Sequence, residues 1–250
     1  TLFPETKIKS VSSAMLNATL VVTGTSHNCN DEHLARKAAL NASVYCMAGV
    51  DHWVNYKKRF CFGSEYILPN EILVSDFAAK VKAEKVFPDC KVSEVENKYL
   101  ATVLSDIASI EQNQDGEYAG DKRMLYVLEP LRGLWVDSLK VSATTLAFEL
   151  FLKNLFHVNI GARLRVRLHP SQTVEDISDI AALIKALPDA ELSQGRSLAE
   201  DISWSTSVIG CESYALFVAL CADREVFSSL PRAAPSLRLP FPQIRELRHI

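Results

Sequence analysis

The sequence lacks the long apolar runs that mark membrane-spanning helices. None of its 250 residues lies in a stretch approaching the roughly 18 uninterrupted apolar residues that cross a bilayer. The first residues also lack a basic segment followed by an apolar one, which is the pattern of a secretory signal. We therefore expect a cytoplasmic protein without a transmembrane segment.

The chain also has little net charge. The formal net charge is -3 and the basic residues are scattered along the chain, so no cationic surface for nucleic acid or an anionic membrane is indicated. Hydrophobic residues make up 48% of the chain and charged residues 23%, values that are typical of folded globular proteins. The composition predicts an ordinary folded protein with no nucleic-acid partner.

Several signatures of catalysis and cofactor binding are absent as well. The six cysteines include no C-x-x-C pair, and the six histidines and the acidic residues show no metal-ligand spacing. There is no G-x-x-x-x-G-K-[ST], no G-x-G-x-x-G and no G-x-S-x-G. These absences argue against a metal centre, P-loop hydrolysis, a dinucleotide dehydrogenase and an α/β-hydrolase, and we expect no cofactor.

What the sequence does contain is a regular alternation of short apolar runs with segments of helical spacing. The predicted strands cover residues 18–23, 42–47, 71–75 and 91–95 in the first half, and 123–128, 163–168, 189–192, 206–210 and 225–228 in the second. The predicted helices cover residues 32–40 and 76–87, then 144–156, 176–187, 197–201 and 212–222. Because parallel neighbouring strands need a crossover connection, this alternation predicts an α/β fold with parallel sheets.

A polar, glycine-bearing stretch without periodicity divides the chain. We expect an N-terminal Rossmann-like domain over 1–110, a linker over 111–122 and a C-terminal Rossmann-like domain over 123–250. The last domain ends in an extended, proline-rich tail, for which a hinge, a surface strap and a partner-binding segment all remain open. Open parallel sheets bind ligands at the carboxyl ends of their strands, so we expect the two sheets to face a cleft that holds any active site.

Two loops of the second half carry candidate ligand-binding groups. His169 and Pro170 directly follow a predicted strand, and the proline holds the chain extended. An imidazole in that position either donates a hydrogen bond to a phosphate or caps the next helix. Gly210, Glu212 and Ser213 form a strand-to-helix turn, which is either an anion site made by free backbone N–H groups or an ordinary turn.

Two loops of the first half carry a second set of candidates. Asp51, with His52 beside it, follows a predicted strand and precedes aromatic residues. A carboxylate shielded by aromatic rings has a raised pKa and suits a general base, although aspartates after strands also cap helices. Gly24, Thr25 and Ser26 follow the first predicted strand and form a possible phosphate or acceptor loop.

The order of these elements resembles the glycosyltransferases of the GT-B architecture, particularly bacterial sialyltransferase-like and Kdo-transferase-like enzymes. The resemblance implies that Asp51 is the general base, that His169 and Pro170 contact the donor phosphate, and that Glu212 and Ser213 hold the phosphate at a helix start. The sequence differs from those relatives by having Asp-His-Trp at residues 51–53 in place of Asp-Asp-Gly, and Glu-Ser at residues 212–213 in place of a serine pair.

On this resemblance the protein transfers a sugar from a nucleotide-sugar donor to a glycan or polysaccharide acceptor. A CMP-sugar is the favoured donor, and UDP- and GDP-sugars remain open. Glu129 and Arg132 follow the first strand of the second half and are expected to touch nucleotide or sugar, although Arg132 equally suits a surface position.

Two other functions fit the same expected fold. A nucleotide-sugar 2-epimerase-like enzyme also uses two Rossmann-like halves, but it needs further acid and base carboxylates, and the loops offer few beyond Asp51, Glu129 and Glu212. A non-catalytic binding subunit of a polysaccharide-synthesis machine predicts nucleotide binding without turnover, or no binding at all. A fold alone does not decide between them.

Overall fold

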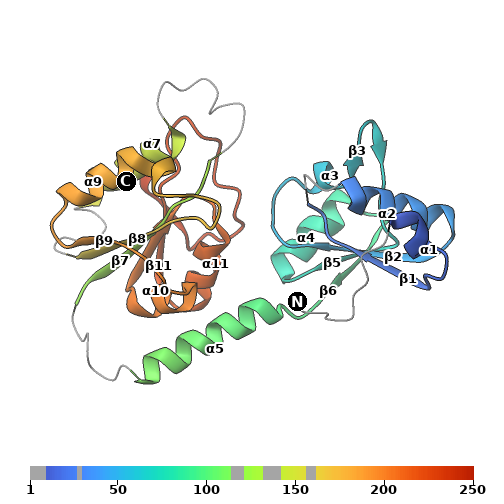
Figure 1. Cartoon of the computed structure of the whole chain (residues 1–250), viewed down its shortest axis with the longest axis horizontal. Coiled ribbons are helices and arrows are strands. Elements are labelled where there is room, and N and C mark those ends of the chain that lie inside the picture. The colour runs from blue at the N-terminus through green and yellow to red at the C-terminus, as the bar shows by residue number, and fades with distance from the viewer. Residues whose placement is uncertain (1–9, 27–29, 114–120, 132–141, 156–161) are drawn as a thin grey trace. The chain divides into compact units, whose positions relative to one another are not determined.

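The computed structural model describes residues 10–26, 30–113, 121–131, 142–155 and 162–250. It confirms an α/β protein with parallel sheets (Figure 1). By their contacts the residues form two compact units, Thr1–Asn97 and Lys98–Ile250, which we describe separately. Within the described ranges, no helix is long and apolar enough to cross a membrane.

The first unit is built on a four-stranded parallel sheet. Its strands lie side by side in chain order: β1 (Leu20–Thr23), β2 (Tyr45–Val50), β5 (Glu71–Val74) and β6 (Lys91–Glu94). The other elements are α1 (Val11–Met15), α2 (Asn30–Asn41), α3 (Tyr56–Arg59), α4 (Phe77–Val86) and the small hairpin of β3 (Cys61–Phe62) and β4 (Glu65–Tyr66). The strand predicted at 42–47 begins and ends three residues later than expected.

By the residues that the structure describes, one face of this sheet is better covered than the other. Right-handed crossovers between strands that are added in one direction put the connecting helices on the same face. Burial agrees with this rule, because Ala48 and Ile72 are fully buried whereas Leu20 and Val22, on the opposite face, are 50% and 63% exposed. Asp76 fixes the start of α4 by accepting a hydrogen bond from the backbone N–H of Ala79.

The second unit is built on a six-stranded parallel sheet in the order β12-β11-β10-β7-β8-β9. Its strands are β7 (Arg123–Val127), β8 (Arg163–Arg167), β9 (Ala190–Leu192), β10 (Ser207–Gly210), β11 (Glu225–Ser228) and β12 (Arg245–Glu246). Its helices are α5 (Lys98–Asn113), α7 (Ala143–Lys153), η1 (Glu175–Ile177), α9 (Ser178–Ala186), α10 (Leu198–Trp204), α11 (Tyr214–Cys221) and η2 (Leu247–His249).

This strand order is that of a Rossmann fold. Numbered along the unit, the spatial order is 3-2-1-4-5-6, so the direction in which strands are added reverses between β7 and β10. Helices α7 and α9 pack together, and α5 packs with α10 and α11, which gives helical layers on the two faces. Tyr126 of β7 contacts the rings of Phe148 and Phe151 of α7 at centroid distances of 4.9 and 5.0 Å, and these three side chains are fully buried.

The helix α5 was not predicted from the sequence. It buries Val103 and Ile107 and packs on α10 and α11, so residues 98–110, which we expected in the first domain, belong by contacts to the second unit. The helix also includes residues 111–113 of the expected linker, whereas residues 114–120 of that linker lie outside the described residues. The apolar stripe of Leu100, Val103, Leu104 and Ile107 was the missed sequence signal.

The proline-rich tail is an integral part of the second unit. It packs Leu230, Leu239 and Ile244 to exposures of 3%, 5% and 5%, and its Phe241 stacks on Phe217 of α11. The tail then forms β12, which pairs in parallel with β11. Burial of these apolar side chains explains why the tail packs against the rest of the second unit.

Candidate functional site

The loops after β7 and β10 meet at the point where the strand order of the second unit reverses. The carboxylate Oε2 of Glu129 accepts a hydrogen bond of 2.8 Å from the backbone N–H of Glu212. The backbone carbonyl of Glu129 accepts a second bond, of 3.0 Å, from the hydroxyl of Thr144 in the first turn of α7. The two loops that the sequence selected are therefore joined directly, at the edge where open α/β sheets bind ligands.

Glu212 is in turn held by a residue of the tail. Its carboxylate, in a residue that is 8% exposed, accepts bonds from the backbone N–H of Arg238 at 2.8 Å and from Nη2 of the same guanidinium at 2.6 Å. Burial raises the pKa of Glu129, with a further rise from the nearby charge of Glu212, while the bond from the Glu212 N–H acts in the opposite direction. Of these two neighbouring carboxylates, Glu212 forms an ion pair with Arg238.

Gly210 and Ser213 have clear structural roles in this turn. A Cβ atom on Gly210 would lie 2.6 Å from Cγ2 of Val127 and 3.2 Å from Cδ2 of Leu216, so the close approach of β10 to β7 requires glycine. The hydroxyl of Ser213 caps α11 by accepting a bond of 3.1 Å from the backbone N–H of Ala215. Both residues hold the turn in shape beside the two carboxylates.

His169 and Pro170 lie two and three residues beyond β8, at the same edge of the sheet. The register pairs Val127 with Arg167, so the chain leaves β7 toward Glu129 and β8 toward His169 side by side. Nδ1 of His169 accepts a bond of 3.2 Å from the backbone N–H of Ser171, which places the proton of the neutral imidazole on Nε2. Pro170 is exposed. Arg132, the remaining expected residue of this group, lies outside the described residues.

In the first unit, Asp51 is fixed by an arginine that the sequence analysis did not select. The Asp51 side chain is 87% exposed, and its Oδ1 lies 2.9 Å from Nη1 of Arg59, whose own side chain is 9% exposed. The same Nη1 donates to the hydroxyl and carbonyl oxygens of Thr25 at 3.2 Å. Arg59 therefore joins the loop after β2 to the loop after β1. Nδ1 of His52 accepts a bond of 3.0 Å from the backbone N–H of Trp53.

The loop after β1 closes on a glutamate of α2. The backbone N–H of Ser26 donates a bond of 2.7 Å to Oε2 of Glu32. A Cβ atom on Gly24 would lie 2.5 Å from Oε1 of the same carboxylate, so glycine lets the loop approach the helix. The carbonyl of Gly24 also accepts a bond of 3.0 Å from Arg36, which is fully buried. Neither Glu32 nor Arg36 stood out in the sequence, because only the folded loop brings backbone groups to them.

No group of three or more histidine, cysteine, aspartate or glutamate side chains that could hold a metal ion occurs among the residues that the structure describes. No family model matches the chain, and a search of curated proteins finds no match to it.

Proposed function

We propose that this protein is a glycosyltransferase that moves a sugar from a nucleotide-sugar donor, with a CMP-sugar favoured, to a glycan acceptor. The observation that carries the proposal is the 3-2-1-4-5-6 strand order of the second unit, with Glu129 and Glu212 at its reversal point and His169 one strand away. Open α/β sheets bind nucleotides at such points. We also propose the GT-B organisation for the two units.

In this mechanism the donor phosphate is bound by the second unit. The Nε2–H of His169 donates a hydrogen bond to a phosphate oxygen, and this bond strengthens as negative charge develops on the departing nucleotide. Support for that role comes from the bond at Nδ1, which fixes the tautomer that presents Nε2–H. The arginine-bound carboxylate of Glu212 is suited to the hydroxyl groups of the ribose.

The acceptor is activated by the first unit in the same proposal. An acceptor hydroxyl attacks the anomeric carbon, the bond from that carbon to the phosphate oxygen breaks, and the hydroxyl proton passes to Asp51. Asp51 is exposed enough to reach an acceptor, and Arg59 orients its carboxylate. The products are the glycosylated acceptor and the free nucleotide.

One observation favours a second candidate, a non-catalytic nucleotide-binding subunit. The backbone N–H of Glu212, which precedes the helix start where a phosphate would bind, already donates to the carboxylate of Glu129. A phosphate in that position would have to displace this carboxylate or bind beside it. The subunit hypothesis predicts nucleotide binding without any sugar transfer.

Calorimetric titration of the full chain with CMP, UDP and GDP tests the donor site. We expect CMP to bind and His169→Ala to weaken CMP binding at least tenfold, because a hydrogen bond to a charged group contributes about 1.5–3 kcal/mol and about 1.4 kcal/mol corresponds to tenfold. Lys185→Ala, an exposed substitution on α9, is the control and should bind as the wild type does. Failure of all three nucleotides to bind, or equal binding by His169→Ala, would overturn the assignment.

Turnover separates the two candidate functions. Release of CMP from CMP-sialic acid or CMP-Kdo in the presence of glycan acceptors should fall about 100-fold or more in Asp51→Asn, as expected on loss of a general base. CMP binding should remain unchanged in that variant. Binding by the wild type with no release from either donor would favour the non-catalytic subunit.

A further inference from the structure

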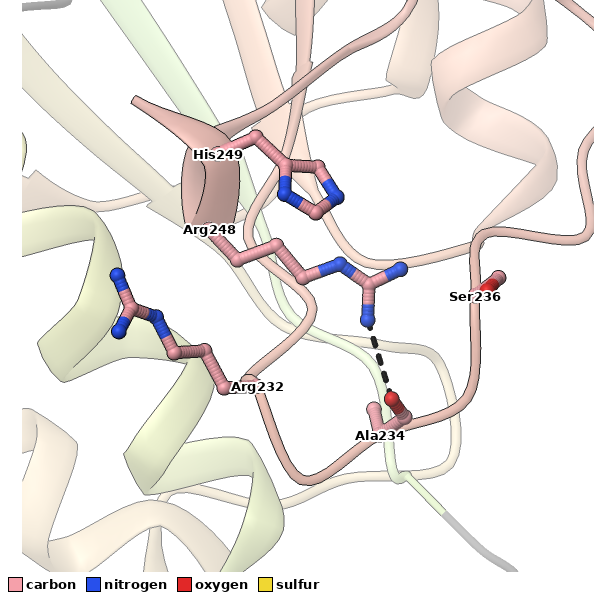
Figure 2. Close-up of a pocket in the computed structure, with 5 residues that line it drawn as sticks. All are labelled: Arg232, Ala234, Ser236, Arg248 and His249. Carbon is pink, nitrogen blue, oxygen red and sulfur yellow. Dashed lines mark hydrogen bonds between the residues drawn. The ribbon is translucent and has the colours of Figure 1, made fainter.

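A pocket lined mostly by basic and polar side chains lies in the tail of the second unit, apart from the residues considered above. It has a volume of about 520 Å³ and is lined by Arg232, Ala234, Ser236, Arg248 and His249 (Figure 2). Its residues come from two segments, one following β11 and the other following β12.

The pocket lies at the ligand-binding edge of the sheet. The parallel register pairs Phe227 with Arg245 and Ser228 with Glu246, so both segments leave their strands at the carboxyl end. The carboxyl edge of an open parallel sheet is where its loops form ligand sites. Topology therefore supports a binding role for this pocket independently of its charge.

Arg248 forms a rigid wall of the pocket. Its side chain is 7% exposed, and its Nη1 donates bonds of 3.0 Å to the carbonyl oxygens of Ala234 and Pro235. Its Nη2 forms an ion pair with the carboxylate of Glu246. These contacts join the two segments and fix the guanidinium. Ligand binding therefore costs no further side-chain entropy of Arg248.

The remaining polar side chains are free to meet a ligand. Arg232 is exposed, and its guanidinium has no hydrogen-bond or ion-pair partner among the described residues. The His249 side chain is 70% exposed, and Ser236 presents an exposed hydroxyl. The carboxylate of Glu246, which forms the ion pair with Arg248, lies 3.8 Å from Nε2 of His249, is 22% exposed and is not among the residues that line the pocket. Hydrogen-bond donors therefore dominate the lining, with Arg232 as its exposed cation.

We propose that this pocket binds a phosphoryl group. An arginine guanidinium pairs with two phosphate oxygens at once, and the exposed guanidinium of Arg232 suits this role. Arg232 is the main ligand, and Arg248, whose charge is balanced by Glu246, fixes the shape of the pocket. The group belongs either to a nucleotide or to a separate phosphorylated ligand. The proposal uses none of the residues assigned to the donor site, so it stands or fails without that assignment.

Titration of the full chain with inorganic phosphate, followed by calorimetry at constant ionic strength, tests the pocket. We expect saturable binding that Arg232→Gln weakens at least tenfold. Arg163→Gln is the matched control, because Arg163 is 45% exposed at the first residue of β8, on the opposite edge of the sheet, and it should bind phosphate as the wild type does. Absence of saturable binding, or an equal loss in Arg163→Gln, would overturn the proposal.

Two further titrations identify the chemistry and source of the group. Acetate at the same concentration should not compete with phosphate, and effective competition by acetate would contradict a phosphoryl site. Weaker phosphate binding at saturating CMP would support a phosphoryl site that receives the nucleotide, whereas unchanged binding would support one that serves a separate ligand. His169→Ala should leave phosphate binding unchanged, so loss of the donor site and loss of this pocket give different results.

Discussion

Asp201 is expected to be the most important single ionic group for the stability of the second unit. It is fully buried and accepts bonds from Nη1 of Arg165 at 3.3 Å, Nη1 of Arg167 at 2.7 Å and the hydroxyl of Ser193 at 2.6 Å. Asp201→Ala leaves two arginines of β8 without their shared buried partner. Breaking a buried ion pair by removing one member typically costs about 3–5 kcal/mol.

Urea unfolding followed by intrinsic fluorescence measures this cost. Trp204 is a suitable reporter in this unit, because the Arg165 guanidinium lies 3.9 Å from its ring centroid. With a slope of about 1–3 kcal/mol per molar urea, the expected loss moves the midpoint downward by on the order of 1–5 M. Asp201→Asn should lie between the wild type and Asp201→Ala, because the amide oxygen still accepts from Ser193.

The matched control is Glu191, which pairs with the same arginine at 2.7 Å but is 50% exposed. Glu191→Ala should cost no more than about 1 kcal/mol, because solvent screens exposed pairs. Equal midpoints for Glu191→Ala and Asp201→Ala would refute the reasoning that burial sets the contribution of this network.

Three further predictions concern single positions. Gly210→Ala should destabilise the second unit by about 1–3 kcal/mol in urea unfolding, because the added Cβ meets Val127 at 2.6 Å, and an effect below 0.5 kcal/mol would contradict this contact. Burial raises the pKa of Glu129 above its unfolded value of about 4.3, so the folded state holds the proton more tightly and the carboxyl costs stability as pH rises through the folded pKa. The stability of Glu129→Gln relative to the wild type should therefore increase between pH 4 and 8. A stability difference that becomes smaller as the pH rises would contradict this prediction. Asp76→Ala should lower the thermal midpoint of the first unit and change the fluorescence of buried Trp53, because it removes the α4 cap and the acceptor of the Trp53 indole N–H; the exposed Asp89→Ala should do neither.

Much of the secondary structure was predictable because its signals are local. β7 is buried on both faces, as a central parallel strand requires, its residues Met124–Val127 are mostly apolar, and it lies where the sequence predicted it. Asp76 and Ser197 mark helix starts by chemistry that acts within three residues, because each side chain accepts a hydrogen bond from the backbone N–H three residues along. Helix α5 was not predicted although the sequence contains its apolar stripe, because the glycine-bearing stretch that follows it indicated a linker.

The sequence predicted which loops carry the candidate sites but not the contacts within those loops. Parallel topology follows from alternation, and it correctly indicated that the loops after β7, β8 and β10 share an edge of one sheet. The hydrogen-bond partners of the residues in those loops could not be predicted from the sequence. Glu129 and Glu212 are separated by 83 residues, and Arg238 comes from a tail whose path the sequence left open.

The sequence by itself therefore determined the α/β class, the parallel strands and the loops that carry polar groups, since these depend on apolar periodicity and capping over a few residues. Only the tertiary structure decided the strand order, the joining of Glu129 to Glu212, the fixing of Asp51 by Arg59 and the basic pocket around Arg232. Each of these depends on which distant segments bury their apolar side chains together. That choice is made by the free energy of the whole core rather than by any local pattern.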